Sequence, residues 1–247
     1  MLTIITNAFH VMRNILPTNH NQFSKIFLKI YDFLEQIKQI PHLSAKQRLK
    51  IAIEQLGNHT METSVAIIND LEQIAHHHPQ YHWIIMDILT SFIRKNAAYT
   101  PQKEVISNPS AKVPGDIQAA LTVIARRDVN KDPENQQLDL SHTDIRGANL
   151  NQANLEQINL YQANLAGANL REANLEGAIL SAANLEGANL YSANLKGAIL
   201  SASNLQRANL QRANLHRASL YLANLHGVIL NDAILDGANF REAKFAE

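Results

Sequence analysis

The chain has 247 residues, of which 46% are hydrophobic and 18% charged, and its 22 basic side chains balance its 22 acidic ones. This composition excludes a disordered chain, and the zero net charge gives no reason to expect attraction to nucleic acid or to an anionic membrane. The absence of cysteine excludes disulfides and thiol nucleophiles. We expect a cytoplasmic protein, because no stretch approaches the roughly 18 to 20 apolar residues of a membrane span and the N-terminus is a poor secretory signal.

Residues 1–97 carry the apolar periodicity of amphipathic helices. Within residues 20–40, an apolar stripe indicates a core-facing helix, favoured over one lying on a membrane surface; it consists of Phe23, Ile26, Phe27, Ile30, Phe33, Leu34 and Ile37. Pro41, Gly57 and Pro79 separate further helical segments. The pair at 61–75 and 80–95 resembles a HEAT-type hairpin in length and spacing. We therefore predict an α-helical domain of HEAT-like hairpins over 1–97.

The next segment changes character. Residues 98–113 are rich in turn formers and predict a linker. Pro114 and Asp116 then mark the start of a helix with Ile117, Leu121 and Ile124 on one face. We expect residues 114–137 to form a helix that caps the second domain and a segment that leads into it.

Motifs for catalysis are missing from the sequence. It contains no G-x-x-x-x-G-K-[ST] phosphate loop, no G-x-S-x-G elbow and no G-x-G-x-x-G stretch. One histidine cluster is present, formed by His76, His77, His78 and His82. Because Pro79 interrupts it, His78 and His82 are not expected to share a helix face. We predict no enzyme, no metal site and no cofactor, and keep a metal-dependent activity at the histidine cluster as an alternative.

From Leu140 to Phe245 every fifth residue is large and apolar, which makes 22 successive repeats of the form A-N-L-x-x. On a helix, a step of five scatters the leucines around the axis, and in one unbroken strand it alternates them between the two sides. Each repeat must therefore contain its own turn. Alanine and leucine, two residues apart, point inward from a short extended stretch, and the next two residues turn the corner. Units this short must stack to bury their leucines, which predicts a solenoid.

The A-N-L-x-x pattern closely resembles the pentapeptide repeat family over residues 138–247. This resemblance implies a right-handed quadrilateral parallel β-helix with four repeats per coil. The segment RLKIAIEQLGN, the helices after it and DIQAALTVIARRD resemble the region that precedes the repeats in bacterial, often cyanobacterial, members. Some family members resemble DNA in outline and inhibit DNA gyrase through a strongly acidic surface. Here Asp139 to Glu247 hold ten acidic and eight basic residues, a net charge of minus two, so a gyrase inhibitor or protector stays a secondary alternative.

Four repeats per coil place residues twenty apart on the same side. Arg207, Arg212 and Arg217 are spaced by five, so they lie at three different corners of about one coil. A nucleic acid backbone running along the solenoid would meet one of them, because Gly187 and Gly227 share the column of Arg207. Since salt-dependent affinity scales with the number of phosphate contacts, this arrangement disfavours nucleic acid as a partner.

The same arithmetic separates the four sides of the coil. Three sides carry mainly asparagine before the inward leucine, whereas the fourth reads Asp139, Asn159, Ile179, Ile199, Ser219 and Asn239. Exposed apolar area often marks an interface. We predict that this side binds a protein partner, or that the N-terminal helices fold back and cover it. The candidate partner-binding residues are Tyr161, Ile179, Ala182, Ile199, Ala202, Tyr221 and Leu222.

The last repeats raise the question of how the solenoid ends. A solenoid must shield its end coils. Phe240 and Phe245 are therefore expected to plug the end or to meet another subunit, which makes a homodimer through a solenoid end one alternative. Taken together, the sequence predicts a scaffold or protein–protein interaction module with a helical domain and a β-solenoid.

Overall fold

The computed structural model describes residues 44–56, 60–99 and 113–245. All of them belong to one compact unit, Ser44–Glu247. The apolar stripe within residues 20–40 lies outside the described residues. Among the described helices, none combines the length and the apolar character that crossing a membrane requires.

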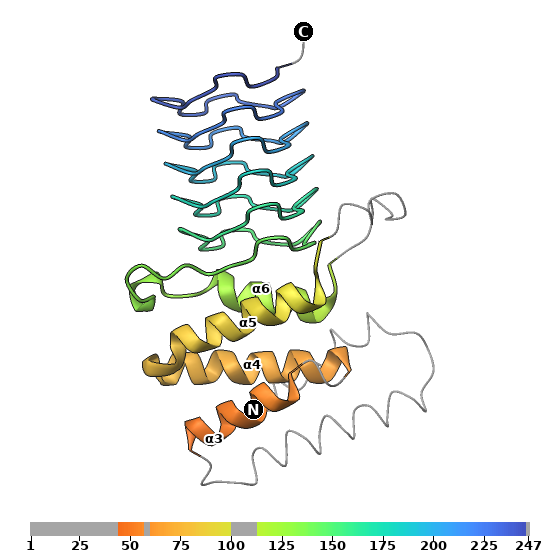
Figure 1. Cartoon of the computed structure of the whole chain (residues 1–247), viewed down its shortest axis with the longest axis vertical. Helices are drawn as coiled ribbons and strands as arrows, with labels where there is room; N and C mark the ends of the chain where they lie inside the picture. The colour runs from red at the N-terminus through yellow and green to blue at the C-terminus, as the bar shows by residue number, and fades with distance from the viewer. Residues whose placement is uncertain (1–43, 57–59, 100–112, 246–247) are drawn as a thin grey trace. The chain divides into compact units, whose positions relative to one another are not determined.

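Within the described residues, four α-helices precede the repeats, in the segments where the periodicity predicted helices (Figure 1). They are α3 (Ala45–Gln55), α4 (Met61–His77), α5 (His82–Asn96) and α6 (Gly115–Ala125). Ser44 begins α3 with a capping box, in which its side chain accepts from the backbone of Gln47 and the Gln47 side chain accepts from the backbone of Ser44. Between α4 and α5, the 3₁₀ turn Pro79–Tyr81 delays the predicted start of the second helix to His82.

The helices share one apolar core. α4 contributes Ile68 and Leu71, α5 contributes Ile85 and Leu89, and α6 contributes Leu121, all of them fully buried. The apolar residues recur at three and four along each helix, so each helix turns one stripe inward. α6 therefore packs on both α4 and α5, and the predicted capping helix is part of the helical core.

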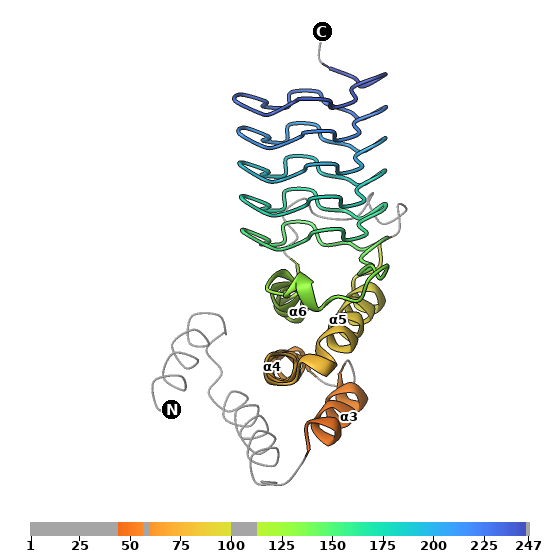
Figure 2. The same ribbon diagram turned by 90° about the vertical axis from the view of Figure 1, so that its left-hand side faces the viewer.

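The repeats stack into a β-solenoid with four repeats per coil. Parallel β-bridges join residues twenty apart throughout, for example Asn154 to Asn174 and Asn174 to Asn194. Up to Leu225 the inward leucines and alanines are buried, as Leu175, Leu180 and Ala178 illustrate. Figures 1 and 2 show the coils as a regular stack. The period of five is thus explained by a four-sided coil in which each repeat makes one side and one corner.

Each corner is a tight turn. In the corner that follows Leu150, the N–H of Ala153 donates to the carbonyl of Leu150 at 3.1 Å, and Gln152 takes a φ of +57°. A positive φ at the third residue of a turn is the feature of a type II turn and favours glycine. Glycine occupies this place in some corners, such as Gly197 with a φ of +65°. Many other corners hold a larger residue at this position, including Arg217. The sequence pattern alone did not indicate that these residues take a positive φ.

α6 caps the first coil on two of its sides. The Gln118 amide donates to the carbonyl of Asn149 and accepts from the N–H of Asn149, both at 2.8 Å. These two bonds take the place of the backbone hydrogen bonds that each later repeat makes with the preceding coil. On the next side, the N–H of Asn154 donates to the carbonyl of Ala125 at the end of α6, also at 2.8 Å. These contacts place α6 against the first coil, and both views show α6 beneath it (Figure 2).

The chain leaving α5 caps a third side. Ala98 forms an antiparallel bridge with Thr143, and the N–H of Tyr99 donates to the carbonyl of His142 at 2.7 Å. Residues 98 and 99, at the start of the predicted linker, therefore pair with the solenoid. The division of the chain into domains at 97, 113 and 137 stays a prediction.

Candidate partner-binding face

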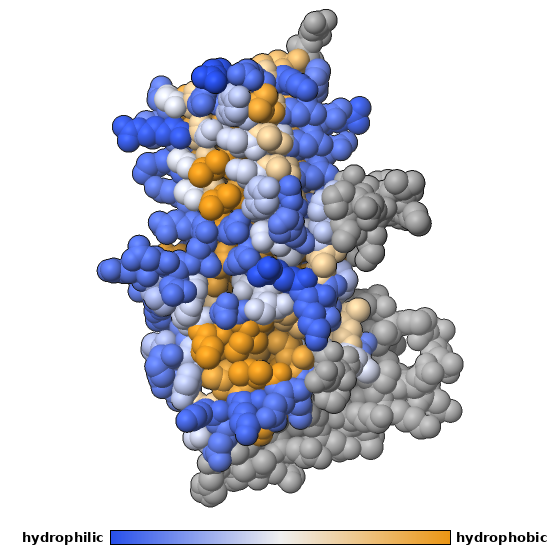
Figure 3. Space-filling view, viewed as in Figure 1, coloured by the Kyte–Doolittle hydropathy of each residue, from blue (hydrophilic) through white to orange (hydrophobic). Residues whose placement is uncertain are grey.

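The side of the solenoid that lacks the asparagine ladder is here called the apolar face. Its central column consists of Asp139, Asn159, Ile179, Ile199, Ser219 and Asn239, joined in sequence by parallel bridges. The structure therefore brings the residues of this column into one line, as the twenty-residue arithmetic predicted. Figure 3 shows one side of the solenoid on which hydrophobic area interrupts a polar surface over successive coils.

The predicted residues of this face are accessible. Tyr161 is 40% exposed, Ile199 41% and Leu222 42%, while Ile179 and Tyr221 are half-buried and Ala182 and Ala202 exposed. Such exposure of large apolar side chains stabilises the fold little, because the favourable term scales with the apolar area removed from water. The described helices leave Ile199 uncovered, so the alternative in which helices fold back over this row finds no support among them.

The two tyrosines at the edge of the face are held by neighbours. The Tyr161 ring meets the His142 ring edge to face, with 5.4 Å between centroids. The Tyr221 ring lies 5.3 Å from the guanidinium of Arg241, and its hydroxyl donates to Glu242 at 3.3 Å. Both rings are thus oriented before any partner arrives, which lowers the entropic cost of binding.

The other three sides are polar for a physical reason. Each asparagine accepts from the backbone N–H two residues ahead, as Asn194 does from Lys196 at 3.3 Å. In many of these residues the amide also donates to the asparagine of the preceding coil, as Asn194 does to Asn174 at 3.0 Å. The isoleucine side chains at 179 and 199 can make neither the bond to the backbone N–H nor the bond between coils. The apolar face therefore gives up a ladder that the rest of the solenoid uses.

At the foot of the apolar face, α5 makes a polar contact. The Arg94 guanidinium lies 2.8 Å from the carboxylate of Asp139, and the Asn159 amide donates to the same carboxylate at 3.0 Å. Over the helices themselves, Figure 3 shows a second hydrophobic area. On α5, Ile84 is 47% exposed. Sequence reasoning missed this area, because Ile84 continues the same apolar pattern as the buried residues of its helix.

The last described coil has no cap among the described residues. Ile229, Ile234 and Leu235 are exposed, and Phe245 is 49% exposed although its ring lies 6.0 Å from that of Phe240. The two phenylalanines pack on one another but leave the inward leucines of this coil partly open. Within the described residues, the N–H groups of Leu230, Leu235 and Phe240 have no backbone acceptor, whereas the N–H of Leu205 donates to Asn224 at 2.8 Å.

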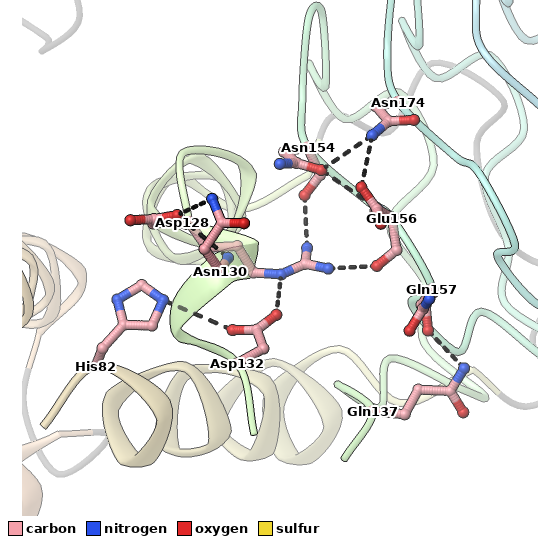
Figure 4. Close-up of polar contacts among 10 residues, drawn as sticks. His82, Asp128, Asn130, Asp132, Gln137, Asn154, Glu156, Gln157 and Asn174 are labelled. Carbon is pink, nitrogen blue, oxygen red and sulfur yellow. Dashed lines mark hydrogen bonds and ion pairs between the residues drawn. The ribbon is translucent and has the colours of Figure 1, made fainter. Parts of the chain in front are cut away.

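A buried polar cluster joins the helices to the solenoid (Figure 4). The Arg127 side chain, 2% exposed, donates to the Asp132 carboxylate at 3.0 Å and to the carbonyls of Asn154 and Glu156. The other Asp132 oxygen faces Nε2 of His82 at 3.7 Å. The sequence alone gave no signal for this role of Arg127, because the pairing depends on how the helices and the first coil meet.

Burial lowers the pKa of His82 below its usual value of 6.5. The nearby Asp132 carboxylate raises it, but this attraction is smaller than the cost of placing a charge in the protein interior, and Lys131 and Arg127 add repulsion. Within the described residues, neither Nε2 of His82 nor the facing Asp132 oxygen has a hydrogen-bond partner. Burial therefore favours the neutral form of the His82 imidazole beside Asp132.

The histidine cluster does not assemble a metal site. His76 and His77 pack ring to ring at the exposed end of α4, and His77 Nδ1 lies 2.8 Å from the carbonyl of Gln73. With His82, they line a cavity of about 610 Å³ between the helices. In the part of the chain that the structure describes, no three histidine or carboxylate groups gather as metal ligands. The alternative of a metal-dependent activity at this cluster thus finds no support there.

The three arginines lie at separate corners, as the arithmetic predicted. Arg207, Arg212 and Arg217 all take positive φ values at their turns. Arg212 lies 3.7 Å from the carboxylate of Asp232 and donates to the hydroxyl of Tyr191 at 2.9 Å. These contacts hold one arginine along its own corner and give no continuous basic surface.

These observations define a β-solenoid repeat protein with a helical cap. The family described as pentapeptide repeats matches the chain in eight copies, over residues 139–177, 168–207, 178–217 and 218–247. The C-terminal half of the chain therefore belongs to the pentapeptide repeat family. Comparison with curated proteins gave no match.

Several solved pentapeptide repeat proteins are similar to this chain. HetL from the cyanobacterium Nostoc, involved in heterocyst differentiation regulation, is 34% identical with a TM-score of 0.26; the match covers 42% of this chain and 62% of HetL, less than two thirds of its length. Rfr23 from the cyanobacterium Cyanothece is 37% identical, with 47% and 69% covered and a TM-score of 0.23. A second Nostoc protein, alr5209, is 33% identical, with 41% and 84% covered and a TM-score of 0.35.

Proposed function

We propose that this protein is a non-enzymatic interaction module whose apolar face binds a protein partner. The observation that supports this proposal is that Ile179 and Ile199 replace the asparagine ladder in two successive rows in the middle of one side. The other outward isoleucines, Ile229 and Ile234, lie singly on two other sides, in the last described coil. The substitution removes hydrogen bonds and leaves Ile199 41% exposed. Because a side chain exposed to this degree contributes little to folding, its benefit is expected in an interface.

The surroundings of the isoleucines fit such a role. Serine and alanine at the adjacent corner keep the surface flat, and Tyr161 and Tyr221 frame it at either end. Flat apolar centres with aromatic anchors are typical of the energetically important part of protein interfaces. No catalytic group is required of the apolar face for this function.

The test is capture of partners from a lysate of the native host by three forms of the full chain. One is the wild type, and the second carries Ile179→Asn and Ile199→Asn, which places the ladder residue of the other sides in both rows. The third is a matched control with Ile229→Asn and Ile234→Asn, since these isoleucines occupy the same outward position on two other sides. Circular dichroism of all three forms establishes that they are folded.

We expect the first variant to lose a specific partner that the wild type and the control retain. The captured protein is then purified, and its affinity for the first variant should fall by at least about tenfold, as for the loss of an interface anchor. Equal affinity for the wild type and this variant would overturn the proposal.

The end of the solenoid is a second candidate surface, and we propose it as a site for a second copy of the chain. The exposed Ile234 and Leu235 and the unpaired N–H groups of the last described coil support this assignment. Open strand edges of this kind pair readily with another chain. Sedimentation velocity of Ile199→Glu with and without Ile234→Glu tests it, since Ile199→Glu removes association through the apolar face, and a dimer that persists in the double variant would contradict it.

A further inference from the structure

The apolar face reads almost the same from either end. About the midpoint between Ile179 and Ile199, isoleucine mirrors isoleucine, and one step outward Asn159 mirrors Ser219. The corner after the face runs Tyr161, Ser181, Ser201 and Tyr221, and the corner before it runs Gln157, Gly177, Gly197 and Arg217. Each of these columns is a near-palindrome with the same centre.

This symmetry has a direct meaning for self-association. In a two-fold interface the same patch is used by both subunits, so that if residue i contacts residue j, residue j contacts residue i. When two solenoids meet through this face in opposite directions, the row of Ile179 lies opposite the row of Ile199 of the other copy. The palindrome then places chemically matching residues opposite one another in every central row.

We propose that the apolar face binds a second copy of this chain in an antiparallel, two-fold arrangement centred between Ile179 and Ile199. This inference rests on the proposed function and names the partner of the same face. In this register Tyr161 lies opposite Tyr221 of the second copy at both ends of the apolar centre.

The contacts that this register creates are favourable. Two isoleucine pairs form the centre, and two tyrosine pairs can stack at the edge, where aromatic pairs add to the energy of burial. Gly177 and Gly197 have no side chain to hold the backbones apart, and nothing lies within 4 Å of the place of a Cβ at Gly197.

The polar residues match as well. Arg217 has no ion-pair partner among the described residues, and in this register it lies opposite the Gln157 amide oxygen of the second copy. Asp139, whose carboxylate is paired with Arg94 of its own chain, lies opposite Asn239 of the second copy, in the row next to Arg241. A parallel pairing would instead place each charged row opposite its own copy, so complementarity favours the antiparallel one.

The size of the face determines how strong this dimer is. Its six rows span about 24 Å and its side is about 10 Å wide, if each step is about 4.8 Å and each residue about 3.3 Å. This area is well below the roughly 800 Å² per partner of a stable interface. The expected dissociation constant therefore lies between about 10 µM and about 1 mM.

The first experiment is sedimentation velocity of the full chain between about 10 µM and about 1 mM. We expect a reversible dimer that Ile199→Glu weakens by at least about tenfold, because it places a charge at the centre of the interface. Ile229→Glu is the matched control and should leave the dimer intact. A wild type that stays monomeric throughout would overturn the proposal, as would a dimer lost in the control but retained in Ile199→Glu.

A second experiment tests the register. The chain has no cysteine, so Asn159→Cys and Ser219→Cys each introduce a single thiol. In the antiparallel register the two positions lie opposite one another, whereas either position is three rows, about 14 Å, from its own copy. A short bismaleimide should therefore cross-link a mixture of the two variants but neither variant alone. Cross-linking of Asn159→Cys with itself would overturn the antiparallel arrangement.

The two proposals fail in different ways. If the wild type is monomeric at every concentration but loses a captured partner on Ile179→Asn and Ile199→Asn, the face binds another protein and the self-association is wrong. If the dimer forms as described and no other protein depends on the face, the partner of the interaction module is the second copy.

Discussion

At the scale of single residues, the fold depends on the backbone angle of the residue at each corner. Every corner in the described solenoid requires a residue with positive φ, and at Gly197 this angle is +65°. Non-glycine residues accept this conformation at a cost of roughly 1 kcal/mol each. The repeats therefore tolerate a strained residue in many corners, because each of the four repeats in a coil buries two inward apolar side chains.

Gly197→Ala should lower the free energy of unfolding by about 1 kcal/mol. Since no atom lies within 4 Å of the added Cβ, backbone strain is the only cost. The reverse change, Ala202→Gly at a φ of +58°, should stabilise the chain by a similar amount. Urea unfolding followed by circular dichroism measures both, and shifts of the same sign in the two variants would contradict this account.

At the scale of elements, the junction of α6 with the first coil depends on Arg127. Its guanidinium satisfies two solenoid carbonyls and one oxygen of Asp132, all in the interior. Arg127→Met keeps much of the volume but leaves the Asp132 charge buried without its partner. We expect a loss of about 3 to 5 kcal/mol in the free energy of unfolding.

The neighbouring arginine supplies the control for this prediction. Arg126 is 67% exposed in its side chain and meets Glu72 at 3.4 Å. Because exposed ion pairs contribute about 1 kcal/mol or less, Arg126→Met should have a small effect. Thermal unfolding of the two variants distinguishes them, and equal shifts in Tm would show that the buried contacts of Arg127 contribute nothing special.

The same junction predicts how stability depends on pH. Since burial lowers the pKa of His82 below 6.5, the unfolded chain binds the proton more readily than the folded chain. This contribution to stability is therefore complete above pH 6.5 and declines as the pH falls through 6.5 towards the lowered pKa. The facing groups are Asp132 and Asp128, which oppose the shift, and Lys131 and Arg127, which support it.

We expect His82→Gln to remove this part of the pH dependence between pH 7 and 5, measured as the change in Tm with pH. His76→Gln, which changes an exposed histidine at the end of α4, is the control and should keep the wild-type slope. An unchanged slope in His82→Gln would rule out the buried histidine as its source.

Much of the solenoid could be predicted from the sequence, and much of the junction could not. The period of five and the twenty-residue coil place Ile179 above Asn159 by arithmetic alone, because the repeat geometry is local. Gln118 and Arg127 gave no comparable signal, since their roles as substitutes for a missing coil depend on where α6 meets the first coil. Handedness and the HEAT-like pairing of α4 with α5 stay predictions.

At the scale of the whole molecule, the two ends of the described solenoid differ. The first coil is paired with α6 and with residues 97–99, while the last described coil carries N–H groups without an acceptor among the described residues. A solenoid has stability that is a sum over neighbouring coils, so an unpaired coil opens more readily than a paired one.

Hydrogen exchange should therefore be asymmetric along the chain. Amides in residues 226–245 are expected to exchange fastest within the solenoid, and those near Asn149 and Asn154 should be protected through Gln118 and Ala125. Mass spectrometry of peptides from the two ends measures this difference. Gln118→Ala should accelerate exchange in the first coil and leave residues 226–245 unchanged, because only the first coil loses its partner. Equal protection at both ends, or a first coil that exchanges fastest in the wild type, would show that the helical cap does not stabilise the solenoid.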